Sequence, residues 1–196
     1  MSNVEVVPYS SSMHDDVVQI LARAFVDHPQ HIAMFGSESL SMNATFGRMG
    51  LSMVCGKKVV AVLEGRVLGF AHWADEARCQ PATTAILRAL PAMFGGLGLR
   101  AGVNAVRTFS LWGAHDPSEP HLHLGPVAVD PDVQGRGVGG LLMRSYCEDL
   151  DEAETAGFLE THGDDNVRFY GRFGFVVVDE AELFGVVNIF MRRPSK

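Results

Sequence analysis

A glycine-rich segment, GPVAVDPDVQGRGVGGLLM at residues 125–143, has the composition of an anion-binding loop. Glycine lets the backbone approach a ligand closely, and a helix that starts directly after the loop presents free N–H groups and the positive end of its dipole. Together these features favour a site for a phosphate or pyrophosphate group. The segment itself leaves one alternative open, a glycine-rich helix start that binds nothing.

Read from Gly135, the same segment has the spacing GxGxxG that is typical of dinucleotide-binding loops. In a Rossmann fold those glycines follow the first strand directly, and a doubly wound sheet continues after them. Here residues 130–134 separate Gly135 from the expected strand, and too little chain remains after Glu160 to complete such a sheet. The order of the segments therefore argues against a dinucleotide cofactor.

Residues that can exchange protons lie close to this loop in the sequence. His121 and His123 alternate in HLHLGPVAV and should share one face of a strand. Histidine titrates near neutral pH, so His123 is a candidate base, and a histidine that is merely hydrogen-bonded is an equal alternative. The pair could also bind a metal ion, but no third ligand lies nearby in the sequence, and we expect no metal. Cys147 has no base paired with it, so we expect no cysteine nucleophile.

A mixed α/β scaffold is expected to position these residues. Alternating or β-branched apolar runs predict strands at 4–10, 57–73 (a hairpin), 121–129, 157–161, 174–180 and 185–193. Apolar residues at helical spacing predict helices at 10–29, 40–54, 137–153 and 164–173, with an irregular helical region at 81–112 that Pro91 and Gly95-Gly96 interrupt.

Local residue types set the expected ends of several elements. The serines at 10–12 can cap the first helix, and Pro29 is expected to end it. Gly65 supplies the positive φ of the hairpin turn. Gly125 and Pro126 predict a bulge or a loss of pairing inside their strand, because proline has no N–H group for the ladder.

The bulk properties indicate one ordinary globular domain that spans residues 1–196. A formal net charge of -7 argues against nucleic-acid binding, which normally needs a basic surface. No apolar run is free enough of charge, proline and glycine for a membrane span, and the N-terminus lacks the regions of a signal peptide. Three widely spaced cysteines suggest a reducing compartment. We therefore expect a cytoplasmic protein without a disulfide framework.

Two motifs resemble those of the GNAT superfamily of N-acetyltransferases. QGRGVG at 134–139 has that family's Q/R-x-x-G-x-G/A form, and the preceding VAVDP is similar to its central strand and exit. NVRFYGRFGF at 166–175 resembles the N-x-x-x-Y-x-x-x-G-F segment that follows the next strand in many members. The close resemblance covers about 121–192. It implies an α/β fold of the α+β type, with a GNAT-like mixed central sheet, two splayed parallel strands and flanking helices.

The resemblance also implies where acetyl-CoA, the acetyl donor of the family, would bind. Between the splayed strands, the pantetheine arm would bond to the backbone of Val127, Ala128 and Val129. The pyrophosphate would lie on the main-chain N–H groups of Gln134, Gly135, Arg136, Gly137, Val138 and Gly139. Asn166 would also bond to the pantetheine arm, and an N-cap is its alternative role.

For the chemistry, the resemblance implies one acid and one base. Tyr170 matches the tyrosine that commonly protonates the departing CoA thiolate, and a core tyrosine packed under Phe175 is the alternative. His123 occupies a strand position where several relatives have a carboxylate, and Glu160 on the next strand is a backup base. The implied mechanism is direct attack by an amine in a ternary complex, without an acyl-enzyme.

The expected function is transfer of an acetyl group from acetyl-CoA to a primary amine of a small molecule. The alternative is a non-catalytic GNAT-like module that binds acyl-CoA. The expected partner is the small-molecule amine, with no nucleic acid and no membrane, and a homodimer is compatible with the sequence. In the family the acceptor site is shaped by segments that correspond here to about 25–54 and 76–120. Residues that could wall it, or simply pack in the core, are Phe25, Met34, Phe35, Trp73, Phe94, Phe109 and Trp112.

Overall fold

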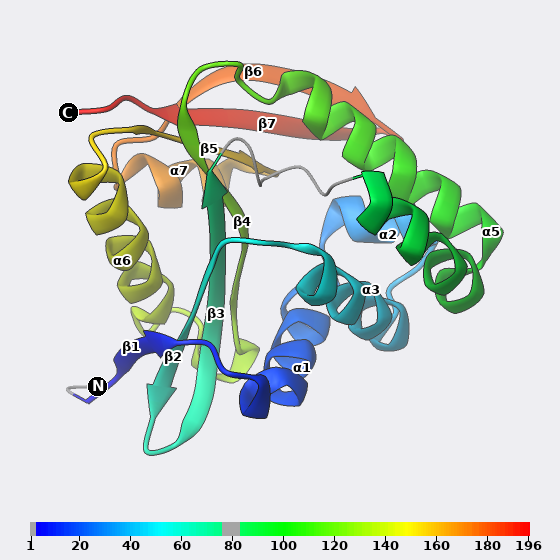
Figure 1. The fold of residues 1–196 in the computed structure, drawn as a ribbon, viewed down its shortest axis with the longest axis horizontal. Coiled ribbons are helices and arrows are strands. Elements are labelled where there is room, and N and C mark those ends of the chain that lie inside the picture. The colour runs from blue at the N-terminus through cyan, green and yellow to red at the C-terminus, as the bar shows by residue number, and fades with distance from the viewer. Residues whose placement is uncertain (1–2, 76–82) are drawn as a thin grey trace.

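A seven-stranded mixed sheet forms the centre of the protein (Figure 1). The computed structural model describes residues 3–75 and 83–196. In spatial order the strands are β1 (Glu5–Pro8), β2 (Lys57–Leu63), β3 (Arg66–Asp75), β4 (His121–Val129), β5 (Ala156–Thr161), β7 (Val186–Arg193) and β6 (Val176–Leu183). Neighbouring strands run antiparallel except β4 and β5, which are parallel. The predicted mixed fold is confirmed.

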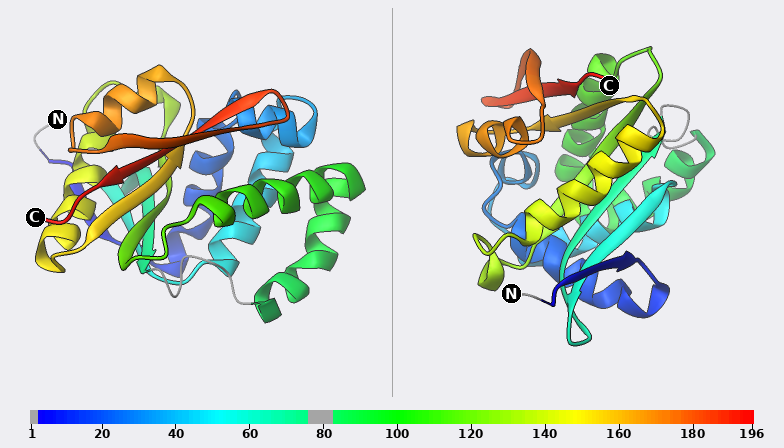
Figure 2. Two further views of the ribbon diagram at one scale, coloured as in Figure 1. Left: turned by 90° about the horizontal axis from the view of Figure 1, so that it is seen from above. Right: turned by 90° about the vertical axis from the view of Figure 1, so that its left-hand side faces the viewer.

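Helices cover both faces of the sheet (Figures 1 and 2). One layer consists of α1 (His14–Ala24), α2 (Pro29–Phe35), α3 (Leu40–Met53) and α5 (Thr83–His115). In it α1 packs on β3 and β4, α3 packs on α1, and α5 packs on α2 and α3. The opposite face carries α6 (Val138–Glu152) and α7 (Asp164–Gly171). None of the helices in the described part of the chain is both long and apolar enough to cross a bilayer.

The two parallel strands at the centre of the sheet separate after a short paired stretch. The ladder joins His121–His123 of β4 to Ala156–Phe158 of β5 and ends there. From the other face, the buried Tyr146 of α6 donates its hydroxyl to the Leu122 carbonyl at 2.6 Å and so fixes the paired end of β4. Beyond His123, β4 therefore leads away from β5. The separation of the two strands from this point on, here called the splay, is the one that the resemblance implies.

A bulge in β4 lies just beyond His123, the last residue that pairs with β5. Gly125 and Pro126 together oppose the single residue His72 of β3, and the register shifts there. A Cβ atom on Gly125 would lie 2.6 Å from the His72 Nδ1 atom, so only glycine leaves room for that imidazole. The predicted bulge is confirmed, and its cause is both the missing proline N–H and this close packing.

Two predicted features of the first helix are wrong. The serines at 10–12 enter a short 3-10 turn, η1 (Ser11–Met13), and their side chains do not cap α1, whose N-cap residue is Met13. Pro29 does not end that helix, because α1 stops at Ala24 and Pro29 starts α2. Proline fits the first helical turn, where its missing N–H would have no partner in any case.

The long helix α5 also differs from the prediction. Pro91 and Gly95-Gly96, the expected interruptions, lie within helical backbone, and the break falls at Gly98 (φ 81°, ψ 165°). Its left-handed φ is one that glycine adopts without steric cost. The first two residues of the predicted region, 81–82, lie outside the described residues. In the early hairpin, by contrast, Gly65 (φ 81°) forms the turn as predicted.

Three histidine rings pack together where α2 meets the end of β5. The ring centroid of His28 lies 5.1 Å from that of His31 and 4.7 Å from that of His162. His31 bonds to the Asn43 amide oxygen at 2.5 Å and His162 to that of Asn188 at 2.9 Å. Burial lowers the pKa of His28 to about 2 and that of His31 to about 4, and it also lowers the pKa of His162. The cluster is therefore neutral at physiological pH.

This cluster predicts that the protein loses stability in mild acid. As the pH falls below about 6.5, the histidines of the unfolded chain bind protons, whereas those of the folded protein stay neutral until the pH reaches their lower pKa values. Proton binding therefore favours the unfolded state. For His31 alone the free energy of unfolding should fall by roughly 2 kcal/mol between pH 7 and pH 5. Urea unfolding at both pH values measures this loss, and His31→Gln should reduce it. Equal stability at the two pH values, or an unchanged loss in the variant, would contradict the expectation.

Candidate active site

The glycine-rich loop connects β4 to α6 and presents an open cradle of backbone N–H groups. Gly135 (φ 73°) and Gly137 (φ 88°) both have left-handed backbone, and a Cβ atom on either would meet no atom within 4 Å. The first hydrogen bond of α6 runs from the Leu141 N–H to the Gly137 carbonyl at 3.1 Å. The N–H groups of residues 138–140 therefore have no partner within the helix, and they point out of its positive end.

The other predicted residues of the loop lie around this cradle. Gln134 donates its side-chain amide to the Val129 carbonyl at 3.1 Å and so ties the loop to the end of β4. Arg136 is exposed. Val127 and Val129 are half-buried against the core beneath α6, and Ala128 is buried against the core beneath α1. The side chains of these three residues therefore pack in the core, and their backbone N–H and C=O groups lie along the part of β4 that leaves β5.

Asn166 is exposed on α7, close to the splay. The N-cap residue of α7 is Gly163, so the alternative role of Asn166 as an N-cap is wrong. Its side-chain amide instead donates to the His162 carbonyl at 3.1 Å, at the end of β5. The predicted contact of Asn166 with a pantetheine arm stays a prediction.

Tyr170 projects from α7 toward the core beneath α6. Its ring makes edge-to-face contacts with Phe169 and Phe175 at centroid distances of 5.1 Å and 6.3 Å. Burial raises the pKa of Tyr170 above its ordinary value, and the negative charge of Glu160 raises it further. The phenol therefore keeps its proton at neutral pH. Packing under Phe175 and a role as proton donor are thus compatible in this geometry.

His123 lies between two carboxylates. Its Nδ1 atom is 2.8 Å from Oδ1 of Asp116, and its Nε2 atom is 2.8 Å from Oε2 of Glu160. Asp116 follows α5 directly, and Glu160 lies on β5 across the splay. Sequence reasoning missed Asp116, because it belongs to a loop without periodicity or motif. His123 thus contacts a carboxylate oxygen through each of its two ring nitrogens.

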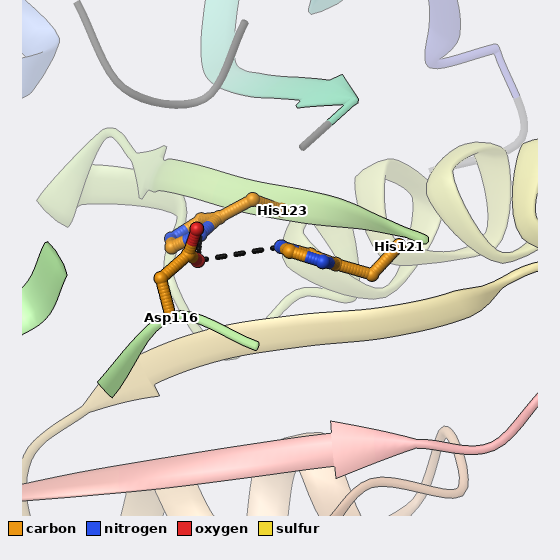
Figure 3. A group of neighbouring side chains, drawn as sticks. All are labelled: Asp116, His121 and His123. Atoms are coloured by element: carbon orange, nitrogen blue, oxygen red, sulfur yellow. Dashed lines mark hydrogen bonds and ion pairs between the residues drawn. The ribbon is translucent and has the colours of Figure 1, made fainter. Parts of the chain in front are cut away.

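Figure 3 shows that His121 and His123 reach the same side chain, Asp116. The His121 Nε2 atom lies 3.3 Å from Oδ1 of Asp116, and its Nδ1 atom lies 2.8 Å from the Glu119 carbonyl oxygen. One nitrogen or oxygen atom of each of the three residues lies within 4.8 Å of the others, so this group could hold a metal ion. The expectation that the histidine pair has no third ligand is therefore wrong. The direct contacts of Asp116 with both rings suit proton transfer equally well.

The remaining candidates divide between core and surface. Trp73 packs in the core beneath α6, and its indole donates to Asp149 at 2.8 Å, so it does not wall an acceptor site. Met34 and Phe35 belong to a core cluster between α2 and α5. The other four belong to the helical layer, with Phe25 at the end of α1 and Phe94, Phe109 and Trp112 on α5, where the Trp112 indole donates to Asn188 of β7 at 2.8 Å. Cys147 is half-buried on α6, and burial raises the pKa of its thiol, which leaves it a poor nucleophile. Cys79 lies outside the described residues.

Comparison with known proteins identifies the family. A sequence model of the acetyltransferase (GNAT) family matches residues 53–175, more than half of the chain. A solved structure described as histone acetyltransferase HPA2 and related acetyltransferase, from Corynebacterium glutamicum, is 20% identical with a TM-score of 0.73, and the alignment covers 98% of this chain and 97% of that one. Arylalkylamine N-acetyltransferase 2 from Aedes aegypti is 16% identical with a TM-score of 0.69, over 98% and 99% of the two chains.

A third solved structure bears on the donor. It is a GNAT family acetyltransferase from Brucella melitensis in complex with acetyl-CoA, 17% identical with a TM-score of 0.54, over 99% of this chain and 89% of that one. At such identities the solved structures show the shared fold, and the family match confirms the resemblance seen in the motifs QGRGVG and NVRFYGRFGF. The chain therefore belongs to the GNAT family of N-acetyltransferases, and acetyl-CoA is its acetyl donor.

Proposed function

We propose that this protein transfers the acetyl group of acetyl-CoA to a primary amine of a small molecule, by direct attack of the amine in a ternary complex. One observation supports the proposal: the two residues predicted as acid and base, Tyr170 and His123, are both influenced by Glu160 on β5. Glu160 lies 2.8 Å from His123, and its negative charge is a second cause, after burial, of the raised pKa of Tyr170. Tyr170 and His123 come from different elements, α7 and β4, and a purely structural role for either would not require this shared influence.

The backbone around the splay supports a defined position for acetyl-CoA. The main-chain N–H groups of residues 134–139 would hold the pyrophosphate at the start of α6, where the helix dipole favours negative charge. The backbone at Val127–Val129 would hold the pantetheine arm, with Asn166 on its other side. In this position the thioester would reach the splay, beside Tyr170.

The proton path follows from the tautomer of His123. In its neutral form His123 would donate Nδ1–H to Asp116, and the 2.8 Å contact between its Nε2 atom and Glu160 would be a hydrogen bond once Glu160 has taken up a proton. A proton that Glu160 receives from the amine can pass to Nε2, and the resulting imidazolium lies between two carboxylates. As the amine nitrogen bonds to the acetyl carbon, the carbon–sulfur bond breaks and the sulfur leaves as a thiolate. Tyr170, which holds its proton at neutral pH, donates it to that sulfur.

Aromatic packing in the helical layer supports a small, partly apolar acceptor. Phe46 of α3 meets Phe35 of α2 and Phe109 of α5 at centroid distances of 5.8 Å each, and Trp112 lies 5.7 Å from Phe109. These rings lie in the segments that shape the acceptor site in the family. The similarity to the arylalkylamine N-acetyltransferase, over nearly the full length of both chains, points in the same direction.

Binding of acetyl-CoA tests the proposed cofactor site without any knowledge of the acceptor. At about a hundredfold excess over its dissociation constant, a ligand that binds only the folded state raises the free energy of unfolding by about 2.7 kcal/mol. Acetyl-CoA should therefore raise the Tm in a thermal shift measurement, whereas NAD at the same concentration should not. Equal shifts with both ligands, or a shift with NAD alone, would overturn the proposed cofactor site.

A further inference from the structure

A buried carboxylate directly precedes the turn that leads into the glycine-rich loop. Asp130 is the first residue after β4, and only 6% of its side chain is exposed. It accepts two hydrogen bonds, from the Asp132 N–H at 3.1 Å and from Arg66 at 2.9 Å, and it forms an ion pair with Arg23 at 3.0 Å. A buried charge with this many partners is strongly held in place. Loss of any one partner would leave its desolvation cost without compensation and so destabilise the folded state.

These contacts connect the loop to two other parts of the fold. Arg23 lies in the last turn of α1, and Arg66 begins β3. The guanidinium of Arg23 spans both carboxylates of the turn, with one nitrogen 3.0 Å from Asp130 and the other 3.0 Å from Asp132. The enclosed turn is η2 (Pro131–Val133), which also forms a backbone bond from the Val133 N–H to the Asp130 carbonyl at 2.9 Å. Both ends of this turn are thus fixed before the chain reaches Gln134.

An acidic residue at this place is unexpected on electrostatic grounds alone. The loop is expected to bind a pyrophosphate, and a nearby carboxylate would repel it. The Asp132 N–H and the two arginines nevertheless hold the pKa of Asp130 below its ordinary value in spite of its burial, so the carboxylate is ionised at neutral pH. Because Arg23 and Arg66 offset this charge, the contacts of Asp130 can contribute to the geometry of the loop. The loop beyond it contains two left-handed glycines, which on their own give the backbone great freedom.

We propose that Asp130 is a positioning residue for acetyl-CoA. Through its contacts with Arg23 and Arg66, here called the Asp130 grip, it fixes the turn so that the N–H groups of the glycine-rich loop face the pyrophosphate. This inference rests on the proposed placement of the pyrophosphate at 134–139. Arg23 also lines a surface pocket of about 370 Å³ between the end of α1 and the loop, together with Asp27 and Gln134. The contacts of Asp130 with Arg23 therefore also connect the loop to the end of α1.

Charge-neutralising substitutions distinguish this positioning role from simple electrostatics. Asp130→Asn and Arg66→Gln remove opposite charges from the same contact. If the contact positions the loop, both should weaken acetyl-CoA binding in isothermal titration, by roughly tenfold to a hundredfold, the range expected for a misplaced binding group. If only charge matters, Asp130→Asn should tighten binding, because it removes a charge that repels the pyrophosphate. Tighter or unchanged binding by Asp130→Asn would overturn the proposal.

Arg23→Lys gives a second test, which does not depend on whether Asp130→Asn folds. Lysine keeps the charge but cannot span two carboxylates as the planar guanidinium does. The proposal expects weaker acetyl-CoA binding by Arg23→Lys, with kcat at saturating acetyl-CoA within roughly twofold of the wild type, because the grip touches neither Tyr170 nor His123. A dissociation constant equal to that of the wild type, or a fall in kcat alone, would contradict it.

Two further variants separate failure of this inference from failure of the cofactor site. Asp151→Asn removes a carboxylate that also contacts two cations, Arg193 and Lys196, but at the far end of α6. Its acetyl-CoA affinity should equal that of the wild type. Gly137→Val puts a branched side chain at the cradle and should abolish binding if the pyrophosphate lies there. Loss in Gly137→Val without loss in Asp130→Asn and Arg23→Lys would refute the grip alone, whereas full binding by Gly137→Val would refute the cofactor site itself.

Discussion

Replacing Tyr170 by phenylalanine is expected to lower kcat by roughly a hundredfold or more, the usual worth of a positioned proton donor. The ring contacts with Phe169 and Phe175 need no hydroxyl, so the fold and the acetyl-CoA affinity should survive. The reason for the large effect is the leaving group, because sulfur departs with negative charge and must be stabilised or protonated as the bond breaks. Steady-state kinetics at saturating acetyl-CoA measure the loss.

Three comparisons make this result specific to the hydroxyl. The acetyl-CoA dissociation constant of Tyr170→Phe, measured by titration, should match that of the wild type. Phe175 is buried against the same core, so Phe175→Leu changes the packing around Tyr170 but keeps its proton, and it should lose much less activity. The loss in Tyr170→Phe should also be smaller at low pH, where water can protonate the thiolate more readily. Full turnover by Tyr170→Phe would show that CoA leaves without help from this residue.

Replacing His123 by alanine should also reduce turnover strongly, by roughly a hundredfold to ten-thousandfold, the range of general base catalysis. The substitution removes the ring that connects Asp116 to Glu160, so a proton taken from the amine can no longer be passed on through it. The expected loss is in kcat, with little change in the KM for acetyl-CoA. Added imidazole should restore part of the rate, because it can enter the space that the side chain leaves.

His123→Gln provides the matched control for this variant. Glutamine fills much of the same space and can bond to a carboxylate, but it cannot take up a proton at these pH values. It should therefore be as inactive as His123→Ala, be more stable to urea, and show no rescue by imidazole. If both variants keep the turnover and the pH profile of the wild type, the proton must leave through Glu160 alone or through water, and the role of His123 would be refuted.

The glycine-rich loop and α7, which carries Tyr170, could be predicted because the sequence patterns that specify them are local. Gly135 and Gly137 adopt the left-handed backbone that glycine alone adopts freely, and Tyr170 stands at a fixed spacing from Asn166. The bulge at Gly125 and Pro126 was likewise encoded by residue type, since proline cannot donate to the ladder. Features that depend only on residues close together in the chain can be predicted from a single sequence.

The groups that orient the site could not be predicted, because their partners are distant in the chain. Asp130 gains its significance from Arg23 and Arg66, which only the packing of α1 and β3 brings to it. Asp116 similarly meets His123 only because the loop after α5 folds back over β4. The start of α2 at Pro29 was missed for another reason: a proline that ends one helix and a proline that begins the next look alike in the sequence.

The most direct test of the proposed function is to measure the products of the wild-type protein. It is incubated with acetyl-CoA and a panel of small primary amines, with lysine-containing peptides as a parallel set. Free thiol and N-acetylated amine are both quantified, the second by mass spectrometry. We expect at least one small amine to be acetylated with one thiol released per product, and this activity to collapse in Tyr170→Phe. Binding of acetyl-CoA with no thiol release above buffer, or acetylation of the peptides only, would contradict the account.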